Sequence, residues 1–176
     1  MRYVVLLLTS LICFFFNSAV LPQAAIFGIQ MDIMLAAMVC MVMLERTMTP
    51  VFYMTGCAVI MDCLFATAIG YYSLPYLLIG LLLYLVMWKW GSGNVKWYAV
   101  PILGGGAWLI KEILSALFSV LLGVSVDLGR TFLTHSLPGI LLAALLTSLL
   151  YLLFARLYRY NFLRPLSARQ EDEYRL

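Results

Sequence analysis

Charged residues are scarce in this sequence of 176 residues, at 11% of the chain, whereas apolar residues make up 65%. Soluble proteins average about 25% charged residues, and a chain this short has too little interior to hide so much apolar surface from water. The scarcity of charge therefore excludes a soluble globule. It also leaves no segment for a soluble catalytic domain or for binding nucleic acid.

Residues that carry common chemistry are also few. The single histidine, His135, has no second metal ligand near it in the sequence, so we interpret it as a polar residue at a membrane interface. Gly104-Gly105-Gly106 lacks the Lys-Ser/Thr that follows in a phosphate-binding loop, and instead indicates close helix approach or a local distortion. We expect no enzyme activity, no cofactor and no metal.

Cysteine usage also argues against a secreted disulfide scaffold. The four cysteines contain no Cys-x-x-Cys pair, and all fall within apolar runs. Free cysteine often behaves as a small buried apolar residue. We therefore interpret all four as buried core residues: Cys13, Cys40, Cys57 and Cys63.

Long apolar runs separated by short turns are what the sequence does contain. A membrane-crossing helix needs about 20 mostly apolar residues, and lipid offers the backbone no hydrogen-bond partners, so the runs are expected to be helical. Six spans are predicted, at residues 3–21, 28–44, 50–70, 72–88, 98–123 and 134–155. Residues 1–158 would form one transmembrane domain, and 159–176 a tail. We expect the first span to be retained, because no good signal-peptide cleavage site follows it.

The positions of lysine and arginine predict the orientation. With the N-terminus in the cytoplasm, nine of the 11 lysines and arginines are cytoplasmic, and only Arg130 lies outside. Positive residues favour cytoplasmic loops. Trp88, Trp90 and Trp97 would form an aromatic belt on the inner side. The sequence therefore predicts a multi-pass membrane protein with both termini in the cytoplasm.

Four charged residues fall within the predicted spans: Asp32, Asp62, Lys111 and Glu112. A charge at the bilayer centre costs at least about 2.5–3.5 kcal/mol, so such residues usually face the protein interior and pair. Counted from the starts of their spans, Asp62 and Lys111 reach similar depths, which predicts that they are neighbours. Two interpretations remain open for these residues and the polar groups near them. They either fix helix packing or line a polar cavity that receives a ligand.

Small residues recur around Asp62 in the third predicted span. Together with Asp62, three small residues recur at every fourth position: Ala58, Ala66 and Gly70. This spacing places them on one face of a helix, and small residues allow helices to pack closely in lipid. We expect a helix-packing face here, either within the protein or toward a partner.

The same region resembles the MreD family of rod-shape-determining membrane proteins. An Asp opens the second span in Met31-Asp32, where the family usually has Pro-Asp. A Gly, an apolar stretch and an Asp follow in Gly56-Cys57-Ala58-Val59-Ile60-Met61-Asp62. Gly70-Tyr71-Tyr72-Ser73-Leu74 and Tyr76-Leu77-Leu78-Ile79-Gly80 continue the pattern, and Glu112 matches an acidic residue of the fifth span. Length and span number agree over the whole chain.

This resemblance implies a non-enzymatic scaffold of the bacterial cell-elongation machinery, located in the bacterial cytoplasmic (inner) membrane. Its expected partners are membrane lipids and an MreC-like bitopic protein, together with an MreB-like filament, a SEDS-type glycosyltransferase and a class B penicillin-binding protein. The expected outcome is lateral-wall peptidoglycan synthesis and rod shape.

The alternative is a substrate-binding S-component of an energy-coupling-factor vitamin transporter, whose six-helix fold is thought to be similar. Such proteins typically carry Ala-x-x-x-Ala on the first helix, and the first span here has no such pair. They also tend to have longer external loops that act as lids, whereas 70–75 leaves almost no loop.

Overall fold

A computed structural model of the chain describes residues 2–20, 31–66, 70–89, 98–121, 123 and 136–158. All regular structure within these residues is helical, which confirms the all-α class. A π-helical turn, η1 (Phe16–Val20), continues the first helix. The α-helices are α1 (Arg2–Phe15), α2 (Ile33–Glu45), α3 (Thr49–Phe65), α4 (Ser73–Lys89), α5 (Ala99–Leu121) and α7 (Leu137–Leu157).

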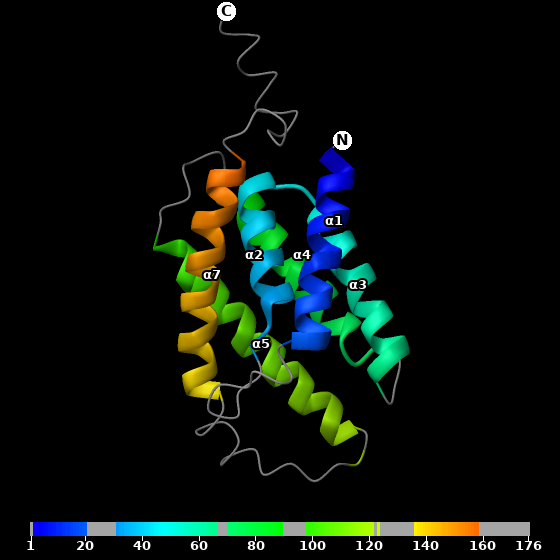
Figure 1. Cartoon of the computed structure of the whole chain (residues 1–176). Coiled ribbons are helices and arrows are strands. Elements are labelled where there is room, and N and C mark those ends of the chain that lie inside the picture. Colours follow the sequence, from blue (N-terminus) through cyan, green and yellow to red (C-terminus); the bar gives the residue numbers. More distant parts are fainter. Residues whose placement is uncertain are drawn as a thin grey trace, which may run out of the picture.

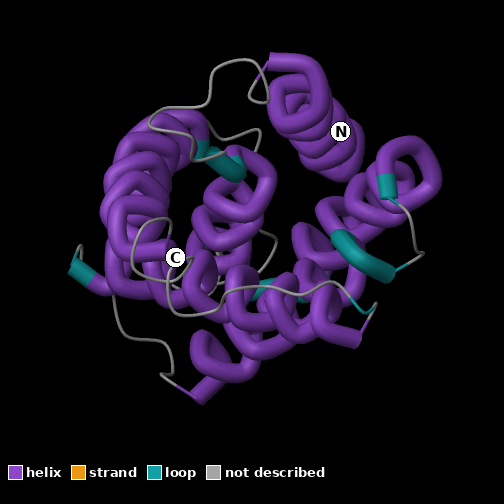
Figure 2. Tube along the Cα trace, turned by 90° about the horizontal axis from the view of Figure 1, so that it is seen from below, coloured by secondary structure: helices purple, strands orange, loops and turns teal. Residues whose placement is uncertain are grey.

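These helices form a single bundle in which the chain runs alternately up and down (Figure 1). The start of α1 and the end of α7 lie at the same end of the bundle, whereas α5 crosses it obliquely (Figure 1). Figure 2 shows the bundle from below, with several helices seen nearly end-on. Each described α-helix overlaps one of the six predicted apolar runs, and all except α5 extend one or two residues beyond it. The tail 159–176 lies outside the described residues.

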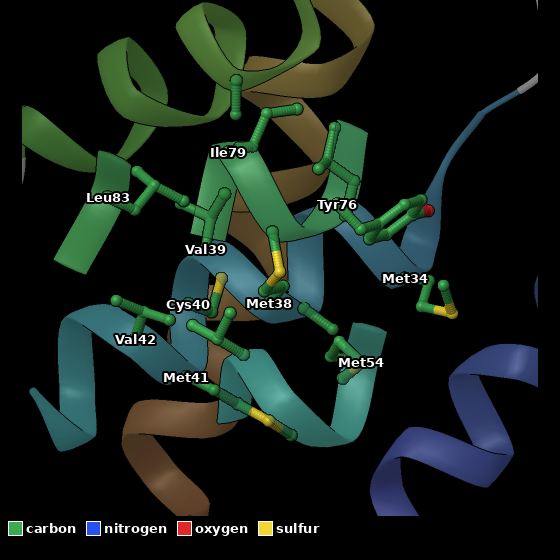
Figure 3. Close-up of a cluster of buried hydrophobic side chains, with 14 of the residues drawn as sticks. Met34, Met38, Val39, Cys40, Met41, Val42, Met54, Tyr76, Ile79 and Leu83 are labelled. Atoms are coloured by element: carbon green, nitrogen blue, oxygen red, sulfur yellow. The ribbon is translucent and has the colours of Figure 1, made fainter. Parts of the chain in front are cut away.

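Helix α2 is the centre of the bundle and contacts every other helix described. Eleven of its 13 residues are buried. Apart from Glu45 at its end, its side chains are apolar on all sides, a pattern typical of a helix enclosed by protein. Four of them are methionines, whose flexible side chains fill irregular space between helices. Figure 3 shows this cluster, in which Met38 and Met41 lie with Met54 of α3 and Ile79 of α4.

Glycines bring the helices around α2 into close contact. A Cβ atom on Gly104 of α5 would lie 2.3 Å from the Oγ1 atom of Thr147 in α7, and one on Gly105 would lie 3.1 Å from Ile140. A Cβ atom on Gly106, in contrast, would meet nothing within 4 Å. Of the two interpretations of this glycine run, close helix approach therefore applies to Gly104 and Gly105.

The outside of the bundle is apolar. Along α7, Leu137, Leu141, Leu145 and Leu149 are all more than half exposed and follow one another at four-residue intervals, so they form one outward face. Helices α5 and α7, with 23 and 21 residues, are long and apolar enough to cross a membrane, whereas the other described helices are apolar but shorter. The third apolar run, predicted to extend to Gly70, is helical only to Phe65.

Candidate functional site

Asp32 lies at the centre of the candidate site, where it begins α2. Its Oδ1 atom accepts a hydrogen bond of 3.0 Å from the backbone N–H of Leu35, so it is the N-cap of the helix. Aspartate suits this position because the first N–H groups of a helix have no partners within the helix, and the helix dipole favours a negative charge there. The Asp32 side chain is 3% exposed, so its charge also needs partners from other helices.

Two other helices supply these partners. Lys111, in the middle of α5, forms an ion pair with Oδ2 of Asp32. Tyr76, in the first turn of α4, donates its hydroxyl hydrogen to Oδ1 at 2.5 Å. The Lys111 Nζ atom also lies 5.2 Å from the centre of the Trp108 ring, within the range of a cation–π interaction. One carboxylate therefore joins α2, α4 and α5.

Asp62 forms a separate site, so its predicted contact with Lys111 is wrong. Its carboxylate accepts hydrogen bonds from the backbone N–H groups of Gly70, Tyr72 and Ser73 at 2.7–3.0 Å, and from the Ser73 hydroxyl at 2.5 Å. The depth estimate counted residues from the starts of the two spans and took no account of where α3 ends. Because α3 ends at Phe65, Asp62 lies in its last turn, and its carboxylate fixes the connection to α4.

The predicted packing face around Asp62 is also interrupted by the end of α3. Ala58 is fully buried on the helix, as expected. Ala66, however, is the C-cap and has an extended backbone (φ −86°, ψ 148°). Gly70 lies in the turn with φ +101°, a conformation that glycine adopts without strain. The three small residues therefore do not share one helix face, and Gly70 is needed for the turn.

Glu112 is not part of the Asp32 site. It is half-buried on α5, and no hydrogen bond or ion pair joins it to another residue within the described part of the chain. Adjacent residues on a helix point in different directions, so the contact of Lys111 with Asp32 turns Glu112 away. Of the four predicted charged residues, the structure therefore brings together only Asp32 and Lys111.

A small cavity lies beside Asp32, between α5 and α7. It is lined by Met31, Asp32, Trp108, Gly139, Leu142, Ala143 and Leu146, and its volume is about 10 Å³. Ligand pockets for small molecules usually measure about 300–1,000 Å³. This cavity is therefore too small for a vitamin-sized ligand. Within the described residues, no three histidine, cysteine or acidic side chains are grouped so that they could hold a metal ion.

A third buried carboxylate, Glu45, was not expected as a site. It is 2% exposed at the end of α2, where it accepts hydrogen bonds from the Tyr158 hydroxyl at 2.6 Å and from Thr47 Oγ1 at 3.2 Å. The Glu45-Arg46 pair in the sequence indicates only the end of a span. The contact with Tyr158 joins residues 113 positions apart, which only the packing of α7 against α2 decides.

The remaining predicted polar and cysteine residues have mixed outcomes. Three cysteines are buried as expected, but Cys63 is exposed on α3. His135 and Arg130 lie outside the described residues.

Compared with known proteins, the chain matches no family model, and no curated protein or solved structure is significantly similar to it.

Proposed function

We propose that this chain is a non-enzymatic scaffold of the MreD type, which spans the bacterial cytoplasmic membrane six times and holds an MreC-like bitopic partner. One observation carries the proposal. The residues of the resemblance around Asp62 and Gly70 form a single hydrogen-bonded turn, with Tyr72 and Ser73 as its other members. Residues that build such a turn stabilise the fold and carry out no chemistry, which agrees with the role of a scaffold.

The shape of the bundle supports six spans in lipid. Helices α3 and α4 have 17 residues each, and α1 with η1 is apolar over Tyr3–Ala19. These lengths lie at the lower end of the range for spanning helices, about 17–25 residues. Helix α2 has only 13 residues, but the other helices enclose it, so few of its polar backbone groups would meet lipid.

The proposed orientation places both termini in the cytoplasm. The two described ends, at Arg2 and Tyr158, lie on the same side of the bundle, which an even number of spans requires (Figure 1). In this orientation Asp32, Asp62 and their hydrogen-bond partners belong to the outer half. The arginine-rich tail would then be able to meet an MreB-like filament, and the outer loops would face the SEDS glycosyltransferase and the class B penicillin-binding protein.

Site-specific photo-crosslinking would test the contact with a bitopic partner. A photoreactive residue is placed in turn at exposed positions on different helices, such as Ile12, Phe52, Leu82, Leu117 and Leu145. One group of neighbouring positions should capture a single-span protein with a large extracytoplasmic region. Met38, which is fully buried in α2, is the matched control and should capture none.

Depletion in a rod-shaped host would then test the cellular role. We expect rounded, widened cells and loss of the MreC-like partner from membrane pull-downs. The outcome that contradicts the proposal is retained shape with lost uptake of a vitamin, together with tight binding of that vitamin by the purified protein. That result would assign the chain to the S-components of vitamin transporters.

A further inference from the structure

The indole of Trp108 has a hydrogen-bond donor that the described protein does not use. Trp108 is 5% exposed, and its Nε1 atom has no hydrogen-bond partner among the described residues. Buried polar groups in proteins are nearly always paired, either with protein or with ordered water. The missing partner therefore needs an explanation at this position.

The cavity beside Asp32 offers space for such a partner. Trp108 and Gly139 both line it, and a Cβ atom on residue 139 would lie only 2.5 Å from Nε1. The N–H edge of the indole therefore faces the space that glycine leaves free. The volume of about 10 Å³ is close to the minimum that one water molecule needs, roughly 10–15 Å³.

Asp32 offers the second contact in the same cavity. An ionised carboxylate has about four acceptor positions, and the structure uses three, for Leu35, Tyr76 and Lys111. Oδ2, which accepts only from Lys111 among the described residues, retains one acceptor position. Trp108 therefore has a free donor and Asp32 a free acceptor, and both residues line one cavity.

We infer that this cavity binds one water molecule, which accepts from the Trp108 N–H and donates to the Asp32 carboxylate. Water fits because it is uncharged, donates and accepts at once, and needs two to four polar partners. A hydroxyl group of a lipid or detergent has the same chemistry, but the volume leaves little room for the carbon that carries it. The inference does not depend on the proposed scaffold function.

Indole N–H spectroscopy on the full chain would test the site. The protein is labelled with ¹⁵N-tryptophan in a lipid nanodisc, and Trp108→Phe identifies its N–H signal among those of the four tryptophans. We expect a downfield, hydrogen-bonded N–H proton with a cross-peak to water. A cross-peak to lipid or detergent protons in place of water, or an upfield N–H proton that contacts only protein methyl groups, would overturn the inference.

Filling the cavity gives a second, independent readout. Gly139→Ala should remove the water cross-peak and move the Trp108 signal upfield, because a methyl group 2.5 Å from Nε1 overlaps the N–H edge of the indole and displaces the ring and the water beside it. Gly106→Ala adds the same methyl group on an open face of α5 and should leave the signal unchanged. If Gly139→Ala does not accumulate, Ala143→Val narrows the cavity from its α7 wall. A water cross-peak that survives a folded cavity-filling variant would place the water elsewhere and contradict the inference.

Discussion

Lys111 in the middle of α5 forms an ion pair with Asp32 at the start of α2, so a single contact joins two helices through residues 79 positions apart. Helix α2 is the one helix in contact with all the others described. The ion pair and the hydrogen bond from Tyr76 therefore fix the position of this central helix along the bundle axis, relative to α4 and α5.

The first prediction concerns the energy of this pair. Lys111→Met should lower the free energy of unfolding by about 3–5 kcal/mol, because it leaves the Asp32 carboxylate buried without its counter-ion. Asp32→Asn keeps a capping oxygen for α2 and removes the charge. The double variant should recover part of the loss, which detergent unfolding curves of all four proteins would measure.

The matched control for this cycle is Glu112→Gln, which removes the neighbouring charge on α5. We expect a change within about 0.5 kcal/mol, as for a substitution that removes no identified contact. Strict additivity of Asp32→Asn and Lys111→Met would show that the two residues are not coupled.

The second prediction concerns the turn after α3. Asp62→Ala leaves the N–H groups of Gly70, Tyr72 and Ser73 without their acceptor, and an unsatisfied buried donor costs about 1–3 kcal/mol. We expect a large loss of stability, with Asp62→Asn intermediate because one oxygen remains. Cys63→Ala, at the exposed neighbouring position, should have little effect. Combined with Lys111→Met, Asp62→Ala should show weaker coupling than the Asp32 pair does.

The third prediction compares two glycines of α5. Gly104→Ala should destabilise the protein by about 1–3 kcal/mol, because the added methyl group overlaps Thr147. Gly106→Ala should be neutral or stabilising, since alanine favours a helix by up to about 1 kcal/mol over glycine and the site is open. Thermal unfolding midpoints would rank the two, and an equal loss at both positions would contradict the packing of α5 on α7.

The fourth prediction concerns membrane topology. Reporter fusions at residue 176 and in the 89–96 connection should report cytoplasm, because the proposed six-span arrangement places most lysines and arginines on that side. Fusions near Gly28 and Gly129 should report the outside. An external C-terminus would be incompatible with six spans and a cytoplasmic N-terminus.

The amino-acid sequence by itself determined the helical class, the approximate place of each helix, and three charged residues that need partners: Asp32, Asp62 and Lys111. These follow from composition and from the length of apolar runs, which are local properties. The sequence did not indicate the buried Glu45. The burial of α2 on all sides agrees with its apolar sequence. The glycine run indicated close helix approach as one of two alternatives, and the structure shows that approach at Gly104.

Only the tertiary structure decided which charges meet. Depth along an assumed straight helix could not show that α3 ends at Phe65, because that end depends on the hydrogen bonds of Asp62 to residues 70–73. Once Asp62 is occupied by backbone N–H groups, Asp32 is the carboxylate that receives Lys111. The pairing of Glu45 with Tyr158 was hidden for the same reason, since it depends on how distant helices pack. Which side chains pair depends on their distances in three dimensions, and the spacing of residues along one helix does not give those distances.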